Sequence, residues 1–172
     1  LFTSLSNNEV FKLKKKLTCA TAAFICILLL GVGFVFSGSK SGEKASGIQW
    51  YSFEEGVEKI KKGDRKGFFH FYTDWCSYCK KMEKETFSDN EVISILNQDF
   101  VSIKINAEEQ PGIAKQFGAS GFPFNRFVDR ENEQIGSQPG FIPPDMMINL
   151  LEYVSTDNYK KMRFDKFMEE RE

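Results

Sequence analysis

A chain of 172 residues is long enough for one domain with a hydrophobic core and for additional segments. Its 23 Lys and Arg residues nearly balance its 24 Asp and Glu residues, so the net charge of -1 gives no electrostatic case for binding nucleic acid. Its 4 cysteines are too few for a small domain held together by many disulfides.

The N-terminal part contains a long uncharged apolar run. The run spans residues 17–36 and follows a basic cluster that ends at Lys16. About 20 helical residues, at about 1.5 Å each, cross a bilayer core about 30 Å thick. Lysines before the run favour a cytoplasmic location for segment 1–16. Everything after the run is then expected on the opposite side of the cytoplasmic membrane. The run is therefore either an uncleaved transmembrane signal anchor, which its length favours, or a cleaved signal peptide.

A linker rich in Ser and Gly, over 37–47, separates this run from a predicted folded domain over 48–155. Ser52 and Glu55 form a capping box that starts a helix ending near Lys62. An aromatic-rich apolar run then predicts a buried strand over 67–73. The elements predicted after it are helices over 76–86, from Ser88 or Asp89 to 97, over 110–117 and over 143–154, and strands over 100–106, 124–129 and 133–138.

The order of these elements predicts the fold class. After a leading helix, strands and helices alternate and then give way to a hairpin and a final helix. This order is typical of an α/β domain with a central mixed β-sheet flanked by helices on both faces. The C-terminal tail over 156–172 is polar with interspersed aromatic residues, and it is either a short helix laid on the domain or a frayed charged segment.

Cys76 and Cys79 are the residues most suited to chemistry. Cys76 lies at the start of a predicted helix, where free N–H groups and the helix dipole lower the pKa of a thiol. Cys79 lies about one turn further on the same face, where it can attack a mixed disulfide formed at Cys76. The spacing predicts a reversible dithiol/disulfide pair. We expect Cys76 to be the more exposed thiol and Cys79 the more buried one.

Other uses of a Cys-x-x-Cys pair are less well supported. A zinc site needs four converging ligands, and Cys19 and Cys26 lie in the apolar run. Lys80, rather than His, follows the pair, so the attachment pattern for c-type haem is absent. We therefore expect neither a metal nor an organic cofactor. A copper-binding or metallochaperone module, using the Cys pair and a His, is the alternative function.

Two motifs resemble the thioredoxin superfamily. They are Trp75-Cys76-Ser77-Tyr78-Cys79 after a buried strand and Gly121-Phe122-Pro123 before a later strand. Segments 73–89, 127–129 and 140–141 are similar to the family of C-terminal periplasmic domains found in the thiol:disulfide interchange protein DsbD. The resemblance covers about 48–155 and implies a thioredoxin-like fold. With one predicted span at most, the chain lacks the multi-span core of that family.

This resemblance implies the function of a protein-disulfide oxidoreductase. The chain is expected to be a single-pass membrane protein whose domain lies on the periplasmic or extracytoplasmic side. Its implied partners are protein disulfide substrates and an upstream thiol that donates electrons, which makes it a reductase. Cys76 is the implied attacking thiol and Cys79 the resolving thiol. We expect the chain to be a monomer.

The resemblance also implies roles for residues around the pair. Trp75 shields the motif and shapes a docking surface for substrate. Pro123 resembles the cis-proline of the family, which with Phe122 presents an extended substrate peptide to the dithiol. Ser77 and Tyr78 differ from the Gly-Pro of reducing thioredoxins, so the reduction potential does not follow from the resemblance.

His70 occupies a position at which the family often has a buried acid. If Phe69 and Phe71 face one side of the strand, His70 faces the other, beneath the motif. Its ordinary pKa is near neutrality, so it can accept a proton from Cys79. The alternative is a core histidine satisfied by a hydrogen bond.

Overall fold

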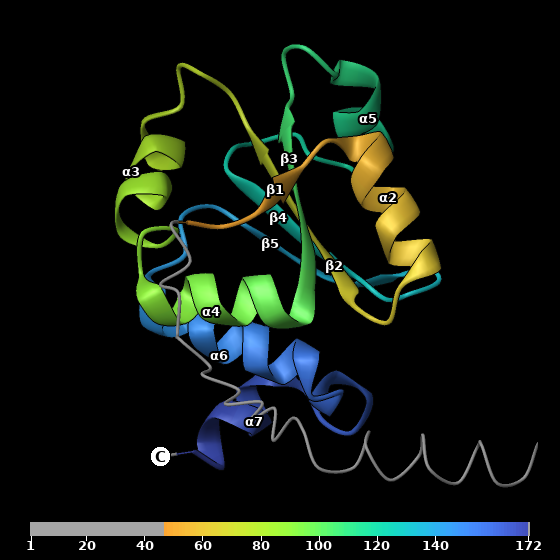
Figure 1. Ribbon diagram of the computed structural model, residues 1–172. Helices are drawn as coiled ribbons and strands as arrows, with labels where there is room; N and C mark the ends of the chain where they lie inside the picture. The colour runs from red at the N-terminus through yellow and green to blue at the C-terminus, as the bar shows by residue number, and fades with distance from the viewer. Residues whose placement is uncertain (1–46, 172) are drawn as a thin grey trace, which may run out of the picture. The chain divides into compact units, whose positions relative to one another are not determined.

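The structure is a computed structural model that describes residues 47–171 (Figure 1). The segments predicted over 1–16 and 17–36, and most of the linker over 37–47, lie outside the described residues. Within 47–171, no helix is both long enough and apolar enough to cross a bilayer.

Five strands form one mixed sheet in the order β1-β3-β2-β4-β5. Strands β1 (Trp50–Tyr51), β3 (Phe100–Asn106) and β2 (Lys66–Tyr72) are parallel to one another. Strand β4 (Phe124–Val128) is antiparallel to β2, and β5 (Gln134–Pro139) is antiparallel to β4. The predicted mixed sheet is confirmed. Strand β1 is only two residues long and was not predicted from the sequence.

Helices cover both faces of this sheet (Figure 1). On one face, α2 (Phe53–Lys62) and α5 (Pro111–Gln116) pack through Ile60 and Ala114 in the core cluster that contains Phe69 and Phe71. On the other face, side chains of three helices surround Phe68 in a second cluster. These helices are α3 (Ser77–Glu85), α4 (Asn90–Asp99) and α6 (Pro144–Ser155).

Local interactions explain where the helices begin and how closely they pack. The predicted capping box of α2 is present, with Ser52 and Glu55 each accepting from the other's backbone N–H. Asp89, rather than Ser88, caps α4 by accepting two backbone N–H bonds. Gly56 allows α2 to approach the sheet, because a Cβ there would collide with the side chain of Ile103.

The C-terminal tail contains a 3-10 turn, η1 (Asn158–Lys160), and a short helix, α7 (Phe164–Glu169). The ring of Tyr153 on α6 lies 5.3 Å from the rings of both Phe164 and Phe167, and its hydroxyl donates a 2.6 Å hydrogen bond to the Met162 carbonyl. The aromatic residues of the tail therefore hold α7 against α6.

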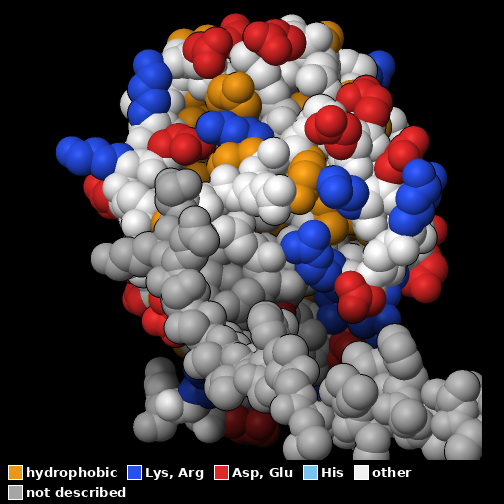
Figure 2. Space-filling view, viewed as in Figure 1, with side chains coloured by type: hydrophobic (Ala, Val, Ile, Leu, Met, Phe, Trp, Pro, Cys, Tyr) orange, Lys and Arg blue, Asp and Glu red, His pale blue; other side chains and the backbone are white. Residues whose placement is uncertain are grey.

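Figure 2 shows cationic and acidic side chains intermixed on the face in view, with no segregation by sign.

Candidate active site

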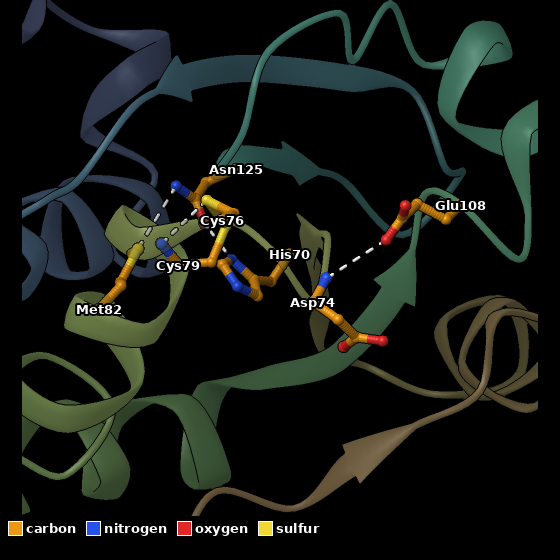
Figure 3. The surroundings of a disulfide bond; sticks show 7 residues. All are labelled: His70, Asp74, Cys76, Cys79, Met82, Glu108 and Asn125. Carbon is orange, nitrogen blue, oxygen red and sulfur yellow. Dashed lines mark hydrogen bonds between the residues drawn. A yellow bond between two sulfur atoms is a disulfide. The ribbon is translucent and has the colours of Figure 1, made fainter.

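Cys76 and Cys79 are joined by a disulfide at the N-terminus of α3 (Figure 3). Cys76 is the N-cap residue of this helix, and its Sγ accepts a 3.0 Å hydrogen bond from the Cys79 backbone N–H. A Cys76 thiolate would receive the same N–H and the positive end of the helix dipole. The predicted position of the pair at a helix start is therefore confirmed.

The expected difference in exposure between the two sulfur-bearing residues is absent in this oxidised form. Cys76 is 4% exposed and Cys79 is 3% exposed. The disulfide and the N–H bond both hold the Cys76 sulfur against the first turn of α3, which accounts for its burial. The large exposed side chains of the motif are instead Trp75 at 69% and Tyr78 at 61%.

Glu108 holds the segment that precedes the cysteines. Its carboxylate accepts a 3.0 Å hydrogen bond from the Trp75 indole Nε1 and a 3.4 Å hydrogen bond from the Asp74 backbone N–H. Glu108 follows the end of β3, so the sheet brings it next to a motif that precedes it by more than 30 residues. Glu108 was not predicted from the sequence, because no local pattern links it to Trp75.

The Phe122–Pro123 peptide bond is cis, as the sequence predicted. Phe71 near the end of β2 pairs with Phe124 at the start of β4. Pro123 therefore lies at the C-terminal end of β2, where the chain continues into the Cys76–Cys79 motif. Pro123 has no N–H, and its carbonyl accepts a 2.7 Å bond from the Gly140 N–H. Among the described residues, the N–H and C=O groups of Phe122 form no backbone hydrogen bond, so they are left for an extended peptide, while its side chain is partly buried.

His70 is fully buried among the residues that surround the disulfide (Figure 3). Phe69 and Phe71 belong to the core cluster on the opposite face, while the His70 ring lies 4.8 Å from that of Phe87 in the other cluster. The predicted orientation beneath the motif is therefore confirmed.

The two ring nitrogens of His70 have different surroundings. Nδ1 lies 2.8 Å from Oδ1 of Asn125, whereas Nε2 is buried without a hydrogen-bond partner among the described residues. The hydrogen bond expected of a core histidine is thus present at Nδ1, and one ring nitrogen remains for another use. Asn125 was not predicted from the sequence. It is the second residue of β4, between Phe124 and Arg126, and a polar residue next to a charged one does not indicate a buried side chain.

Burial lowers the pKa of His70 from its ordinary value of 6.5 to about 4, because desolvation penalises the imidazolium. The hydrogen bond to Asn125 acts in the opposite direction, and the positive charge of Lys104 lowers the pKa further. His70 is therefore neutral near pH 7.

The part of the chain from 47 to 171 contains no group of three or more His, Cys, Asp or Glu side chains placed to hold a metal ion. The two cysteines are bonded to each other, and the Nδ1 of His70 is bonded to Asn125. No observation at this site favours the copper-binding alternative.

Comparison with known proteins agrees with the fold and the motif. A thioredoxin-like domain model matches residues 53–155. DsbD of Haemophilus influenzae is 37% identical over 90 residues, which cover 47% of this chain and 15% of that protein. Human spermatogenesis-associated protein 20 is 30% identical over 107 residues, which cover 57% of this chain and 14% of that protein. The matches thus span about one seventh of these relatives.

A solved structure also shares the fold. A thioredoxin from Thermus thermophilus superposes with a TM-score of 0.58 and 22% identity, and the match covers 63% of this chain and 87% of the thioredoxin. The family match extends over more than half of the chain and includes both cysteines. The chain therefore belongs to the thioredoxin-like domain family and is similar over 90 residues to DsbD.

Proposed function

We propose that this protein is a thiol:disulfide oxidoreductase that reduces disulfides in other proteins. The observation that carries the proposal is the Cys76–Cys79 disulfide at the N-terminus of α3, beside the cis-Pro123 loop. A disulfide that closes so short a loop restricts the unfolded chain little, so stabilisation of the fold is a poor explanation for it. Exchange chemistry uses the same two residues directly.

The reaction proceeds through a mixed disulfide. In the reduced protein, the Cys76 thiolate attacks one sulfur of a substrate disulfide and the other substrate sulfur leaves as a thiolate. Cys79 then attacks Cys76, the Cys76–Cys79 bond forms, and the second substrate sulfur leaves. Two electrons pass from the dithiol to the substrate, and an upstream thiol donor reduces the pair again.

Trp75, Phe122 and Pro123 form the proposed substrate-binding surface. The exposed indole of Trp75 is oriented by its bond to Glu108 rather than free to rotate. Phe122 lines an apolar pocket with Ala107 and offers its main-chain groups for pairing with an extended peptide. An unfolded or extended segment around a substrate disulfide suits this combination of an aromatic side chain and unpaired backbone.

His70 is the proposed acceptor of the Cys79 proton. Cys79 is buried, and burial in apolar surroundings raises the pKa of a thiol, so its attack requires a base. His70 is neutral near pH 7 and has a ring nitrogen without a partner among the described residues. The imidazolium is unfavourable in this buried place, so the proton is held only briefly and passes to the departing substrate thiolate.

A trapping experiment tests this function. Cys79→Ser removes the resolving thiol, so we expect Cys76 to remain bound to protein partners through a disulfide that dithiothreitol releases. The variant with both cysteines replaced by serine is the matched control and should trap nothing. Absence of adducts with Cys79→Ser, together with an inability of the unaltered protein to reduce a model protein disulfide, would contradict the proposal.

The direction of electron flow and the location are separate parts of the proposal. A Cys76–Cys79 reduction potential of about -270 mV would suit a reductase, whereas a value of about -120 mV would indicate an oxidant. The similarity to DsbD favours the reductase. The apolar run over 17–36 supports tethering of the domain at the extracytoplasmic side of the membrane. That the tethered domain acts as a monomer is a further part of the proposal. Release of the full chain from membranes by alkaline carbonate would argue against the tether.

A further inference from the structure

The side-chain amide of Asn125 has a defined orientation. Its Oδ1 lies 2.8 Å from Nδ1 of His70, its Nδ2 donates a 3.2 Å hydrogen bond to the carbonyl of Gln138, and Nδ2 also lies 3.9 Å from Sδ of Met82. A carbonyl oxygen and a thioether sulfur only accept hydrogen bonds, so the NH₂ group must face both. The amide oxygen must then face His70.

This orientation selects one tautomer of His70. The Oδ1 atom of Asn125 can only accept, so the hydrogen of a neutral His70 lies on Nδ1. Nε2 then carries the lone pair, and it is this nitrogen that has no partner among the described residues. We propose that Asn125 is a positioning residue that holds His70 in the Nδ1–H tautomer, so that Nε2 accepts the proton of Cys79. This inference rests on the proposed function and adds a residue to it.

The role can be placed in the resolving step. The Cys79 sulfur forms a bond to the Cys76 sulfur, the bond from Cys76 to the substrate sulfur breaks, and its electron pair leaves with the substrate. The Cys79 proton moves to Nε2 of His70, and from there to the departing substrate thiolate. Nδ1 keeps its hydrogen and its bond to Asn125 throughout, so only one ring nitrogen changes protonation state.

Asn125 also helps His70 to carry a charge. After Nε2 is protonated, Oδ1 of Asn125 still accepts from Nδ1–H, and a hydrogen bond to an ionised donor is stronger than one to a neutral donor. The bond thus raises the pKa of His70 against the desolvation that lowers it. The titratable or charged groups near the ring are Tyr72 on β2, Lys104 on β3, and Cys76 and Cys79 at the start of α3. The charge of Lys104 is paired with that of Glu83 on α3.

The tautomer can be measured without ambiguity, because His70 is the only histidine in the chain. Nitrogen NMR of the full chain labelled with ¹⁵N-histidine should show, near pH 7, a protonated Nδ1 and an unprotonated Nε2. Asn125→Leu should lose this preference and shift both resonances. A spectrum dominated by the Nε2–H tautomer in the unaltered chain, or one that Asn125→Leu leaves unchanged, would overturn the inference.

Kinetics test whether the tautomer matters for exchange. Asn125→Leu should slow the resolution of a preformed mixed disulfide at Cys76 on the order of tenfold, a part of the typical effect of general-base catalysis. Asn125→Asp keeps an acceptor and adds negative charge, so it should retain the Nδ1–H tautomer and move the acidic limb of the pH–rate profile to higher pH. An unchanged rate and pH profile in both variants would refute the role.

Ser102→Ala is the matched control. Ser102 is buried in β3, and its hydroxyl has no hydrogen-bond partner among the described residues. Ser102 is opposite Phe68, whereas Lys104 is opposite His70, so the substitution removes a buried polar group that is not paired with His70. It should leave the nitrogen spectrum and the resolution rate unchanged. If the unaltered chain forms no mixed disulfides, the proposed function fails, and this role fails with it. If it forms and resolves them while Asn125 variants behave normally, only the role of Asn125 fails.

Discussion

Burial of His70 makes the stability of the folded domain depend on pH. The pKa of His70 is about 4 in the folded chain and about 6.5 in an unfolded one. Between these values the unfolded chain binds a proton that the folded chain does not, so protonation favours unfolding. The free energy of unfolding should therefore fall by about 3 kcal/mol as the pH decreases from 7 to 4, and should be insensitive to His70 above about pH 6.5.

Denaturant titrations of the oxidised protein across this range measure the effect. His70→Gln removes the titration but retains an amide that can donate to Asn125, so the variant should lose the slope between pH 6.5 and 4. The carboxyl groups of Glu58, Asp157 and Asp165 have lowered pKa values, and they act mainly below this window in both proteins. Equal slopes for the two proteins would show that His70 is not the buried neutral group described here.

Among individual residues, the two cysteines were predicted from the sequence, but the residues that the fold brings close to them were not. Cys76 and Cys79 are close in the chain, and their spacing alone predicts the disulfide pair. Asn125 lies 55 residues from His70, and only the pairing of β2 with β4 brings the two side chains together. The burial of Cys76 likewise depends on the contacts of the folded motif rather than on its position in the sequence.

Among the elements, the long periodic ones were predicted and the short one was missed. The capping box of α2 and the apolar runs of β2 and β3 are local patterns, so their bounds agree with the structure within about two residues. Strand β1 is only two residues long, and it exists because Trp50 and Tyr51 pair with Ser102 and Ile103. A pair of residues has no periodicity to detect.

The C-terminal tail shows the same dependence on tertiary contacts. Six helical residues are too few to be stable alone, so the sequence left a choice between a helix and a frayed end. The rings of Phe164 and Phe167 against Tyr153 decide in favour of the helix. The buried Lys66 also anchors the start of the tail. Its Nζ donates a 3.0 Å hydrogen bond to the Ser155 carbonyl and lies 3.2 Å from the Asp157 carboxylate.

In the whole molecule, the order of strands explains how one short motif becomes a site. Strand β2 lies at the centre of the sheet, with parallel β3 on one side and antiparallel β4 on the other. The cysteines follow the end of β2, and Glu108 follows the end of β3. Pro123 directly precedes β4, and Asn125 is the second residue of that strand. The alternation of elements predicted a mixed sheet, but the pairing that assembles these residues required the tertiary structure.

The same architecture predicts that residues 47–172 fold without the segment before them. The described members of both core clusters lie between Ile48 and Val154, on either face of a single sheet. The residues of the candidate active site lie on or beside that sheet. A chain beginning at Gly47 should therefore unfold cooperatively, with the same denaturant midpoint and the same Cys76–Cys79 reduction potential as the full chain. Circular dichroism with denaturant, and equilibration with glutathione or dithiothreitol buffers, measure the two quantities.

A shift in potential with an unchanged midpoint would mean that the N-terminal segment acts on the dithiol itself. A loss of cooperative unfolding would mean that it completes the fold.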